Sequence, residues 1–470
     1  MVIMKSEVLS SSVVRLTGAC PTRTVVQALE PYSKGSLVWE VPPAKVPDGL
    51  VPPALLALAQ RPPLDASGAV EVPSALWQHL FPYQREGVQR VVHQFRGRCL
   101  LADQMGLGKT LQAVACILHY GLPTLVVCPA FLCMNWRRTL EQWGAEATVC
   151  SYGKVPTGEW GLVVADEAHY LKSRESQRTQ ATLPLLLAAP RALLLTGTPC
   201  PNRPEELFTL VHALRPTLVP DFTAFAARYC NPRRTPFCAY DTRGSDRPAE
   251  LKWLLQRACQ VRRTKAEVLP QLPVKLQGML YIDADPSSRA ELAMLRAKLD
   301  TALARGCRLA QTLMMEMYRA TAHAKAQSAA ALVAARVQPG TVIFAHHQVV
   351  LDAIQQALPV TLRVGRIDGH TTLPHRQRVV DGMQAGNLDV ALLSMGAAGV
   401  GLTLTRAAVA YFLEIPWCPA VLRQCEDRIH RIGQESVCTI YYVLAEETLD
   451  AHVWHTIHRK ERVAARIGQS

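Results

Sequence analysis

Short apolar runs alternate with longer segments of helical periodicity along most of the chain. Each run ends at a polar or glycine-containing turn, which is typical of buried strands in a parallel α/β sheet. Two groups of strand candidates stand apart in the sequence. The first contains TLVVCP (124–129), GLVVADEA (161–168) and ALLLTGTP (192–199), and the second contains TVIFAHH (341–347), VALLSM (390–395), VAYFLEI (409–415) and TIYYVLA (439–445).

A mainly helical stretch, roughly residues 200–336, separates the two groups and ends in the alanine-rich ATAHAKAQSAAALVAARV. This order predicts an α/β fold with two lobes, each built on a parallel sheet. A helical region would join the lobes, and a cleft would lie between them.

Prolines punctuate the sequence ahead of the first lobe, between residues 42 and 73. Because proline removes an amide donor and disfavours helix at the preceding residue, this stretch predicts a linker or an extended edge. Before it, TRTVVQALEPYSKGSLVWEVP predicts a helix, a turn at Ser33–Ser36 and a strand. The expected domains are a small N-terminal element (1–41), the proline-rich linker (42–74), a first lobe with a helical insertion (75–275), a helical connecting region (276–336) and a second lobe with a C-terminal helix (337–470).

The composition fits a folded protein with a polyanionic partner. The chain has 470 residues, of which 49% are hydrophobic and 19% charged, and a formal net charge of +13. Its length fits two or three domains. The positive charge favours a polyanion without identifying one, because scattered solvated lysines and arginines would produce the same value.

Fourteen cysteines are spread through apolar segments, and none forms a C-x-x-C pair of the zinc-ribbon kind. Reduced, buried cysteines are therefore expected, as in the cytosol or nucleus. The sequence has no signal-peptide pattern and no apolar run of the roughly 18 residues that a membrane span needs. We expect a soluble intracellular protein without a membrane partner, nuclear if eukaryotic and otherwise cytoplasmic.

The stretch ADQMGLGKT (102–110) could be a phosphate-binding loop or an ordinary turn between a strand and a helix. Strict P-loop spacing requires glycine where Asp103 stands. The residues that would contact a nucleotide are nevertheless present, because glycines let backbone amides approach phosphate oxygens and the following helix presents its positive end. They are Gly106, Gly108, Lys109, which would reach the β- and γ-phosphates, and Thr110, which would hold Mg²⁺.

An acidic pair follows the apolar run in LVVADEAH. Asp166 is placed to hold Mg²⁺ through water, and Glu167 to orient or deprotonate the attacking water. The alternative is a helix start enriched in acids, which would stabilise the helix dipole. The glycine-containing loop upstream in the same lobe favours the catalytic interpretation.

Near the C-terminal end, QCEDRIHRIGQ places Arg428 and Arg431 three residues apart, which on a helix is one face. Two guanidiniums facing a cleft could neutralise the charge on a transferring γ-phosphate. Taken alone, the pattern is more often a solvated basic helix. Its position in the second lobe, opposite the lobe that contains Lys109, favours the arginine-finger role.

Three further patterns have simpler interpretations. The basic segments RRTK (262–265) and NPRRTP (231–236) could be a solvated face or a DNA-tracking face. The histidines of HVWHTIH, which are His452, His455 and His458, are better explained by a packed C-terminal helix than by a metal site. The pair HH at 346–347 follows a strand, and we expect no ligand role for it.

Eight motifs in this order resemble the helicase-like ATPases of the Swi/Snf type, and the match covers roughly residues 75–465. Within that family, RPEELFTLVHALRPTLVPDFTAFAARYC and VIFAHHQVVLDAI look most like the annealing helicases, the HepA-related branch that rewinds DNA at stalled forks. The eight motifs are LFPYQREGV, DQMGLGKT, VVCPAFLCMNW, DEAH, LLLTGTP, IDGHT, SMGAAGVGLTLTRA and EDRIHRIGQ.

The resemblance implies an α/β fold of two RecA-like P-loop lobes with parallel sheets, of which the first (75–275) binds ATP and the second is 337–470. It also implies further site residues. Gln84 would contact adenine, and Gln424 would lie beside the nucleotide. The segment Thr196, Gly197, Thr198 and Pro199 would couple the ATP state to lobe movement. Gly399, Gly401 and Leu402 would line the second lobe's face of the cleft. Duplex contacts would come from turns near Pro129, Gly197 and Thr403, through backbone amides and hydroxyls against phosphates.

The resemblance also implies a function. The chain would be an ATP- and Mg²⁺-dependent DNA translocase of the annealing-helicase type, which acts as a monomer on duplex, forked or branched DNA. A single-strand-binding protein is a further candidate partner, although no docking motif is visible. One alternative is a nucleosome-remodelling ATPase, against which the absence of obvious histone-reading extensions argues. The other is a nucleic-acid-binding scaffold with weak ATPase activity, whose signature would be a broken catalytic motif.

Overall fold

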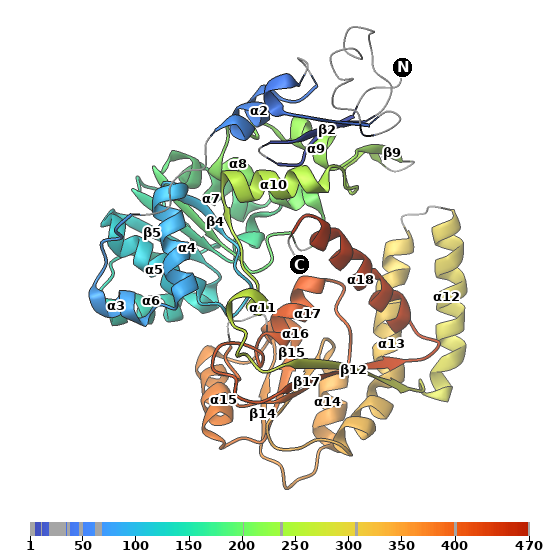
Figure 1. Ribbon diagram of the computed structural model, residues 1–470. Coiled ribbons are helices and arrows are strands. Elements are labelled where there is room, and N and C mark those ends of the chain that lie inside the picture. The colour runs from blue at the N-terminus through green and yellow to red at the C-terminus, as the bar shows by residue number, and fades with distance from the viewer. Residues whose placement is uncertain are drawn as a thin grey trace. The chain divides into compact units, whose positions relative to one another are not determined.

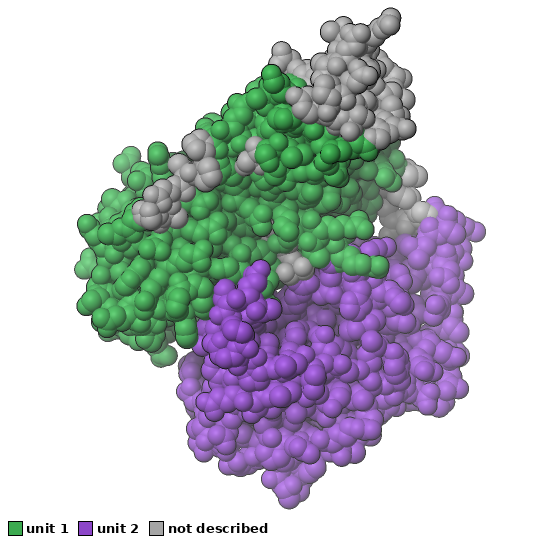
Figure 2. Space-filling model, in the orientation of Figure 1, with its two compact units in different colours: residues 1–104, 108–264, 462–470 green, residues 105–107, 265–461 purple. Residues whose placement is uncertain are grey.

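The chain folds as two compact units, each built on a six-stranded sheet (Figures 1 and 2). The computed structural model describes residues 5–10, 12–17, 34, 38–46, 50–61, 68–200, 202–235, 238–305, 309–398 and 402–468. Unit 1 comprises residues 1–104, 108–264 and 462–470, and unit 2 comprises residues 105–107 and 265–461. All neighbouring strands of both six-stranded sheets are parallel, which confirms the predicted α/β fold class with two parallel sheets.

The sheet of unit 1 has the strand order β11-β4-β8-β7-β5-β6. Strands β5 and β7 are buried along their whole length, and alternate side chains face two separate cores, as the two-residue period of a strand requires. In β5, Leu125 and Val127 face one core, whereas Val126 and Cys128 face the other. The strands are β4 (Arg98–Leu101), β5 (Thr124–Cys128), β6 (Thr148–Ser151), β7 (Leu162–Asp166), β8 (Arg191–Leu195) and β11 (Gln260–Val261).

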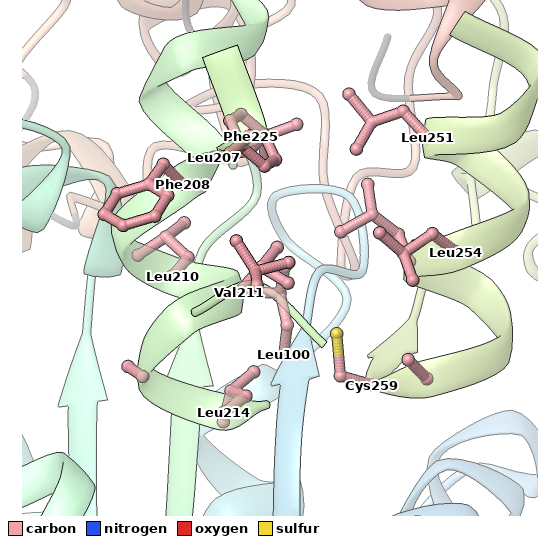
Figure 3. Packing of buried hydrophobic residues seen from close by; sticks show 14 of the residues in the cluster. Leu100, Leu207, Phe208, Leu210, Val211, Leu214, Phe225, Leu251, Leu254 and Cys259 are labelled. Carbon is pink, nitrogen blue, oxygen red and sulfur yellow. The ribbon is translucent and has the colours of Figure 1, made fainter. Parts of the chain in front are cut away.

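Helices cover both faces of this sheet. One group packs into the first core, which contains Val126, Cys128 and Trp136. This group comprises α3 (Ser74–His79), α4 (Pro82–Gln89), α5 (Lys109–Tyr120) and α6 (Cys133–Trp143). The other group packs into the second core and comprises α7 (Gln177–Ala188), α8 (Phe208–Leu214), α9 (Phe222–Tyr229) and α10 (Pro248–Ala258). Figure 3 shows this second core, where Val211 and Leu214 of α8 lie near Leu100 of β4 and opposite Leu254 of α10. A hairpin, β9 (Arg233–Thr235) with β10 (Cys238–Asp241), lies between α9 and α10 in the sequence.

A small antiparallel sheet precedes this lobe, formed by β1 (Lys5–Val8), β2 (Val14–Thr17) and β3 (Val38–Val41). The strand predicted in the N-terminal element is therefore present as β3. The helix predicted there, and most of the turn, lie outside the described residues. Part of the proline-rich stretch differs from the prediction, because Pro53–Gln60 forms helix α2. Proline at the first helical position loses no hydrogen bond, and Leu55, Leu58 and Ala59 then pack into the core of unit 1.

The sheet of unit 2 has the order β12-β17-β16-β13-β15-β14. It contains all four strands predicted in the second group. The stretch 276–336, predicted to be helical, differs at its start, because residues 275–282 form edge strand β12. The strands are β12 (Lys275–Ile282), β13 (Thr341–Ala345), β14 (Val364–Ile367), β15 (Val390–Ser394), β16 (Val409–Phe412) and β17 (Cys438–Ala445).

Helices also complete two cores in unit 2. They are α12 (Arg289–Ala304), α13 (Leu309–Ala334), α14 (Gln348–Ala357), α15 (Leu373–Ala385), α16 (Met395–Ala398), α17 (Pro419–Glu426) and α18 (Asp450–Arg466). The short helix α11 (Lys265–Val268) precedes them in the sequence and contributes to neither core. No helix within the described ranges is both long and apolar enough to cross a membrane.

Candidate nucleotide site

The glycine-containing loop joins the carboxyl end of β4 to the first residue of α5. Gly106 and Gly108 have φ angles of +84° and +72°, a region that favours glycine. A Cβ atom on Gly108 would collide with Nε2 of Gln84, whose side chain is buried over the loop. The amide of Phe81 donates to Gln84 Oε1 at 2.9 Å and fixes that side chain. The loop therefore brings bare backbone to the amino end of α5, where the first amides have no partner within the helix.

Lys109 is the first residue of α5, and its ammonium group lies over its own loop. Nζ donates to the carbonyl oxygen of Asp103 at 2.7 Å and to that of Gln104 at 3.4 Å. Burial lowers the pKa of Lys109, while the charges of Glu167, Asp103 and Asp166 act in the opposite direction. The group therefore stands at the loop as a poorly hydrated cation, which is suited to a phosphate oxygen. Thr110 follows as the second residue of the helix and is partly exposed.

Asp166 is the last residue of β7, and its carboxylate is held by two donors. The indole Nε1 of Trp136 donates to Oδ2 at 2.8 Å, and the amide of Glu167 donates to Oδ1 at 2.8 Å. Burial raises the pKa of Asp166 to about 6, and the charge of Glu167 acts in the same direction. A divalent cation at this carboxylate would offset both effects, so the group fits a role at Mg²⁺.

Glu167 has φ = +50° and ψ = 50°, a left-handed conformation that is uncommon for a residue other than glycine. Its carboxylate lies 3.2 Å from Nδ1 of His169. The same nitrogen lies 3.2 Å from the hydroxyl of Thr196, which accepts a hydrogen bond from the amide of Thr198 at 3.1 Å. His169 therefore connects the acidic pair to the segment predicted to couple nucleotide state to movement. The sequence reasoning assigned no role to His169 or to Trp136.

Arg428 and Arg431 do not share a helix face, and that prediction is wrong. Helix α17 ends at Glu426, and both arginines lie in the turn that follows it. The carbonyl oxygen of Arg428 accepts a hydrogen bond from the amide of Leu404 at 2.9 Å. Gly433, with φ = +92°, closes the turn. The two guanidiniums are nevertheless adjacent, since Nη1 of Arg428 and Nη1 of Arg431 reach the carbonyl oxygen of Leu402 at 3.5 and 3.4 Å.

Burial lowers the pKa of Arg431 to about 10, and the adjacent charge of Arg428 acts in the same direction. A buried and a partly buried guanidinium on one carbonyl oxygen are electrostatically costly, so an anion beside them would be stabilised. Gln424 is buried on α17 in the same unit, and Thr403 lies in the partly exposed segment after Leu402. Gly399 and Gly401, predicted to line the site, lie outside the described residues.

The remaining predicted contacts belong to unit 1. Pro129 follows β5, and Gly197 follows β8, so both stand at the carboxyl edge of the sheet, as do the loop after β4 and Asp166. In parallel sheets this edge is where ligands bind. Unit 1 thus assembles an ammonium group, a hydroxyl, a carboxylate pair and helix-start amides at one edge, and this donor set fits a magnesium–nucleotide phosphate.

The histidines outside this region do not form a metal site. Among the described residues, no group of three or more histidine, cysteine, aspartate or glutamate side chains is arranged to hold a metal ion. His452, His455 and His458 are exposed on α18, a helix that the sequence predicted. His347 instead pairs with buried Glu414 at 2.6 Å, which accounts for it as a structural residue.

Two family models match the chain. The SNF2-related domain matches residues 83–157 and 150–318, and the helicase conserved C-terminal domain matches residues 324–433. The chain belongs to the SNF2-related family. The first model covers unit 1 from Tyr83 onward and extends into unit 2 as far as α13. The second covers most of the sheet of unit 2.

Curated relatives in the SNF2-related family are also similar to this chain. The "SWI/SNF-related matrix-associated actin-dependent regulator of chromatin subfamily A-like protein 1" of Xenopus tropicalis is 35% identical over 85% of this chain and 46% of its own length. The "DNA annealing helicase and endonuclease ZRANB3" of Mus musculus is 35% identical over 83% of this chain and 41% of its own length. The chain thus spans less than half the length of these relatives. The Sulfolobus solfataricus SWI2/SNF2 ATPase core in complex with dsDNA was also found, at 21% identity over 83% of this chain and 93% of that chain, with a TM-score of 0.39.

Proposed function

We propose that this chain is an ATP-dependent DNA translocase of the annealing-helicase type. The observation that supports it most directly is the set of groups at one edge of the sheet of unit 1. There the Lys109 ammonium stands over the glycine-containing loop that follows β4, and the Asp166–Glu167 pair stands at the carboxyl end of β7, which β8 separates from β4. Membership of the SNF2-related family supports the same conclusion, as do relatives that are named annealing helicases.

In this proposal ATP supplies the γ-phosphoryl group, and Mg²⁺ neutralises its developing charge. Lys109 would bind the β- and γ-phosphates, Thr110 and Asp166 would hold Mg²⁺, and Glu167 would orient or deprotonate the attacking water. Gln84 binds adenine over Gly108. The residues proposed from unit 2 are Arg428 and Arg431 as charge-stabilising arginines, and Gly399, Gly401 and Gln424 as nucleotide neighbours.

DNA is the proposed partner, in duplex, forked or branched form. The net charge of +13 favours a polyanion, and the relatives' printed names refer to DNA annealing and to chromatin. Pro129, Gly197 and Thr403 are the proposed sites of phosphate contact. Thr196, Gly197 and Thr198 would report the nucleotide state through His169. We propose that the chain acts as a monomer, in the nucleus if it is eukaryotic and otherwise in the cytoplasm, with a single-strand-binding protein as a candidate partner.

The test is ATP turnover with no DNA and with single-stranded, duplex, forked and nucleosomal DNA, together with a strand-annealing assay on the same preparation. The proposal predicts stimulation by forked or duplex DNA and ATP-dependent annealing. Stimulation by nucleosomes alone would identify a remodelling ATPase instead. DNA binding without any ATP turnover would identify a scaffold, and both results would contradict the proposal.

A further inference from the structure

The basic segment RRTK (262–265) is neither a solvated face nor a DNA-tracking face. Arg263 is only 8% exposed and Lys265 only 5%. Each side chain forms a buried ion pair, the first with Asp103 and the second with Asp427. The sequence prediction of an exposed basic face is therefore wrong for both residues, since neither is free to meet a DNA phosphate.

In unit 1, Arg263 fixes the start of the phosphate loop. Its Nε and Nη2 donate to the two carboxylate oxygens of Asp103 at 3.0 and 2.6 Å. Gln112 of α5 donates to the same carboxylate at 3.0 Å and accepts from Arg263 at 3.0 Å. Arg263 also donates to the carbonyl oxygen of Tyr83, the residue before Gln84. This network explains why Asp103 stands where strict P-loop spacing has glycine.

The backbone reinforces the same attachment. The amide of Gln104 donates to the carbonyl oxygen of Arg263 at 2.9 Å, and the amide of Ala102 donates to that of Val261 at 2.7 Å. The carbonyl oxygen of Asp103 in turn accepts from Nζ of Lys109. Any movement of Arg263 therefore moves the acceptor of the lysine that is proposed to bind phosphate.

In unit 2, Lys265 fixes the turn that contains the two arginines. Its Nζ donates to Oδ1 of Asp427 at 2.5 Å and to the carbonyl oxygen of His430. The ring Nε2 of His430 lies 2.9 Å from the carbonyl oxygen of Pro273. Arg428 directly follows Asp427, and Arg431 directly follows His430. Both arginines are thus adjacent in sequence to residues held by the chain segment that begins at Lys265.

We propose that Arg263 and Lys265 are positioning residues for ATP turnover, which act together through the single residue between them. Arg263 sets the phosphate loop through Asp103, and Lys265 sets the arginine turn through Asp427. Two Cα–Cα steps span at most about 7 Å, so neither attachment can shift far without pulling on the other. This inference rests on the proposed function, because it assigns roles relative to the same nucleotide.

A role in stability alone is a weaker explanation. Buried ion pairs contribute little net stability relative to apolar residues of similar size, because desolvation offsets their attraction. Their geometry is directional, however, and the fork of an arginine against both oxygens of a carboxylate restricts orientation. Two such pairs, on residues 263 and 265, therefore restrict the orientation of the phosphate loop and of the arginine turn more than they raise the free energy of unfolding.

The test for unit 2 compares Lys265→Met with Lys325→Met. Lys325 forms a similarly buried ion pair with Asp450 in the same unit. Lys325→Met therefore leaves a buried carboxylate unpaired, as Lys265→Met does, but away from the arginine turn. For Lys265→Met we expect kcat to fall by about 100-fold, the usual effect of misplacing a catalytic group, whereas the Kd of a non-hydrolysable ATP analogue stays within about threefold. Lys325→Met should lower the melting temperature and leave kcat of the folded protein unchanged. A normal kcat in Lys265→Met would overturn the proposal.

If Lys265→Met does not fold because Asp427 is left unpaired, the double variant Lys265→Met/Asp427→Leu removes both charges and replaces it in the test. The corresponding test for unit 1 is Arg263→Lys against Arg228→Lys, since Arg228 forms a two-point pair with buried Glu250 in unit 1. Lysine cannot span both carboxylate oxygens, so the analogue's Kd should rise about tenfold in Arg263→Lys only. An unchanged Kd would overturn the role of Arg263.

Coupling is tested by inserting two glycines after Thr264, which leaves each ion pair available but lengthens the link. We expect DNA stimulation of ATP turnover to be lost while turnover without DNA persists. Wild-type stimulation in the insertion variant would contradict coupling. A wild-type chain that shows no DNA-stimulated turnover would instead refute the proposed function, so the two failures are distinguishable.

Discussion

The hydrogen bond from Trp136 to Asp166 should set the pH at which the protein binds magnesium. Trp136 is fully buried, and its indole nitrogen lies 2.8 Å from Oδ2 of Asp166. The bond favours the charged carboxylate, in opposition to burial and to the charge of Glu167, which together raise the pKa of Asp166 to about 6. Trp136→Phe removes the donor but keeps an aromatic ring, so the pKa of Asp166 should rise further.

A hydrogen bond to a charged group contributes about 1.5–3 kcal/mol, and about 1.4 kcal/mol corresponds to one pH unit. The pKa of Asp166 in the variant should therefore lie at about 7–8. Since Mg²⁺ binds the ionised acid, the binding-competent fraction at pH 7 should fall from about nine-tenths to about a quarter, taking a pKa of about 7.5 for the variant. The half-saturating Mg²⁺ concentration should then rise about fourfold at pH 7 and about sixteenfold at pH 6, and remain unchanged at pH 9.

The assay is ATP turnover as a function of Mg²⁺ concentration at pH 6, 7 and 9, with the Mg²⁺-induced rise in melting temperature as a second readout. Trp143→Phe is the matched control, because Trp143 is on the same helix and its indole nitrogen is buried with no hydrogen-bond partner among the described residues. The control should follow the wild type at every pH. A half-saturating concentration in Trp136→Phe that changes equally at pH 6 and pH 9 would refute the reasoning.

Other variants test neighbouring parts of the account. Gly108→Ala should raise KM for ATP by at least about tenfold, because the φ of Gly108 is +72° and the new Cβ would collide with Gln84. The control is Gly121→Ala, which is also at positive φ but has open space around it. It should cost about 1 kcal/mol of stability and leave KM unchanged. Arg98→Met should lower the free energy of unfolding by about 3 kcal/mol or more, measured by chemical denaturation, because the guanidinium donates to the carbonyl oxygens of Leu186, Ala189, Ala213 and Leu214; an unchanged midpoint would contradict this. Asp166→Asn should abolish the rise in melting temperature that Mg²⁺ produces without nucleotide, and a retained rise would place the cation elsewhere.

The interior of both sheets could be predicted from the sequence, whereas their edges could not. The seven strands predicted in the two six-stranded sheets are all interior strands, and the apolar residues that precede the phosphate loop mark another, β4. The strands of the two six-stranded sheets without a prediction are β6, β11, β12 and β14, which are the edge strands of these sheets. Three of these edge strands are partly exposed and lack the fully apolar pattern of a buried strand: β12 leaves Leu276, Met279 and Tyr281 exposed. The fourth, β11, is buried but has only two residues.

The candidate site also has a part that could be predicted from the sequence and a part that could not. Local spacing was sufficient to predict Lys109 beside its loop and Asp166 at a strand end, because each depends on neighbours in sequence. It failed for the arginine turn, where nothing before Gly433 indicates that the helix ends at Glu426. It also could not reveal Trp136, Arg263 or Lys265, since their partners are 30, 160 and 162 residues away in the chain.

The proposed function assigns Lys109 and Arg431 to one ATP molecule. The most direct test is a double-mutant cycle on DNA-stimulated kcat with Lys109→Ala, Arg431→Ala and the double variant, all checked for folding. Residues that act as a unit are non-additive, so each single variant should lose at least about 1,000-fold and the double variant should be little worse than the slower single. Losses that multiply in the double variant, or wild-type turnover in Arg431→Ala, would contradict the account.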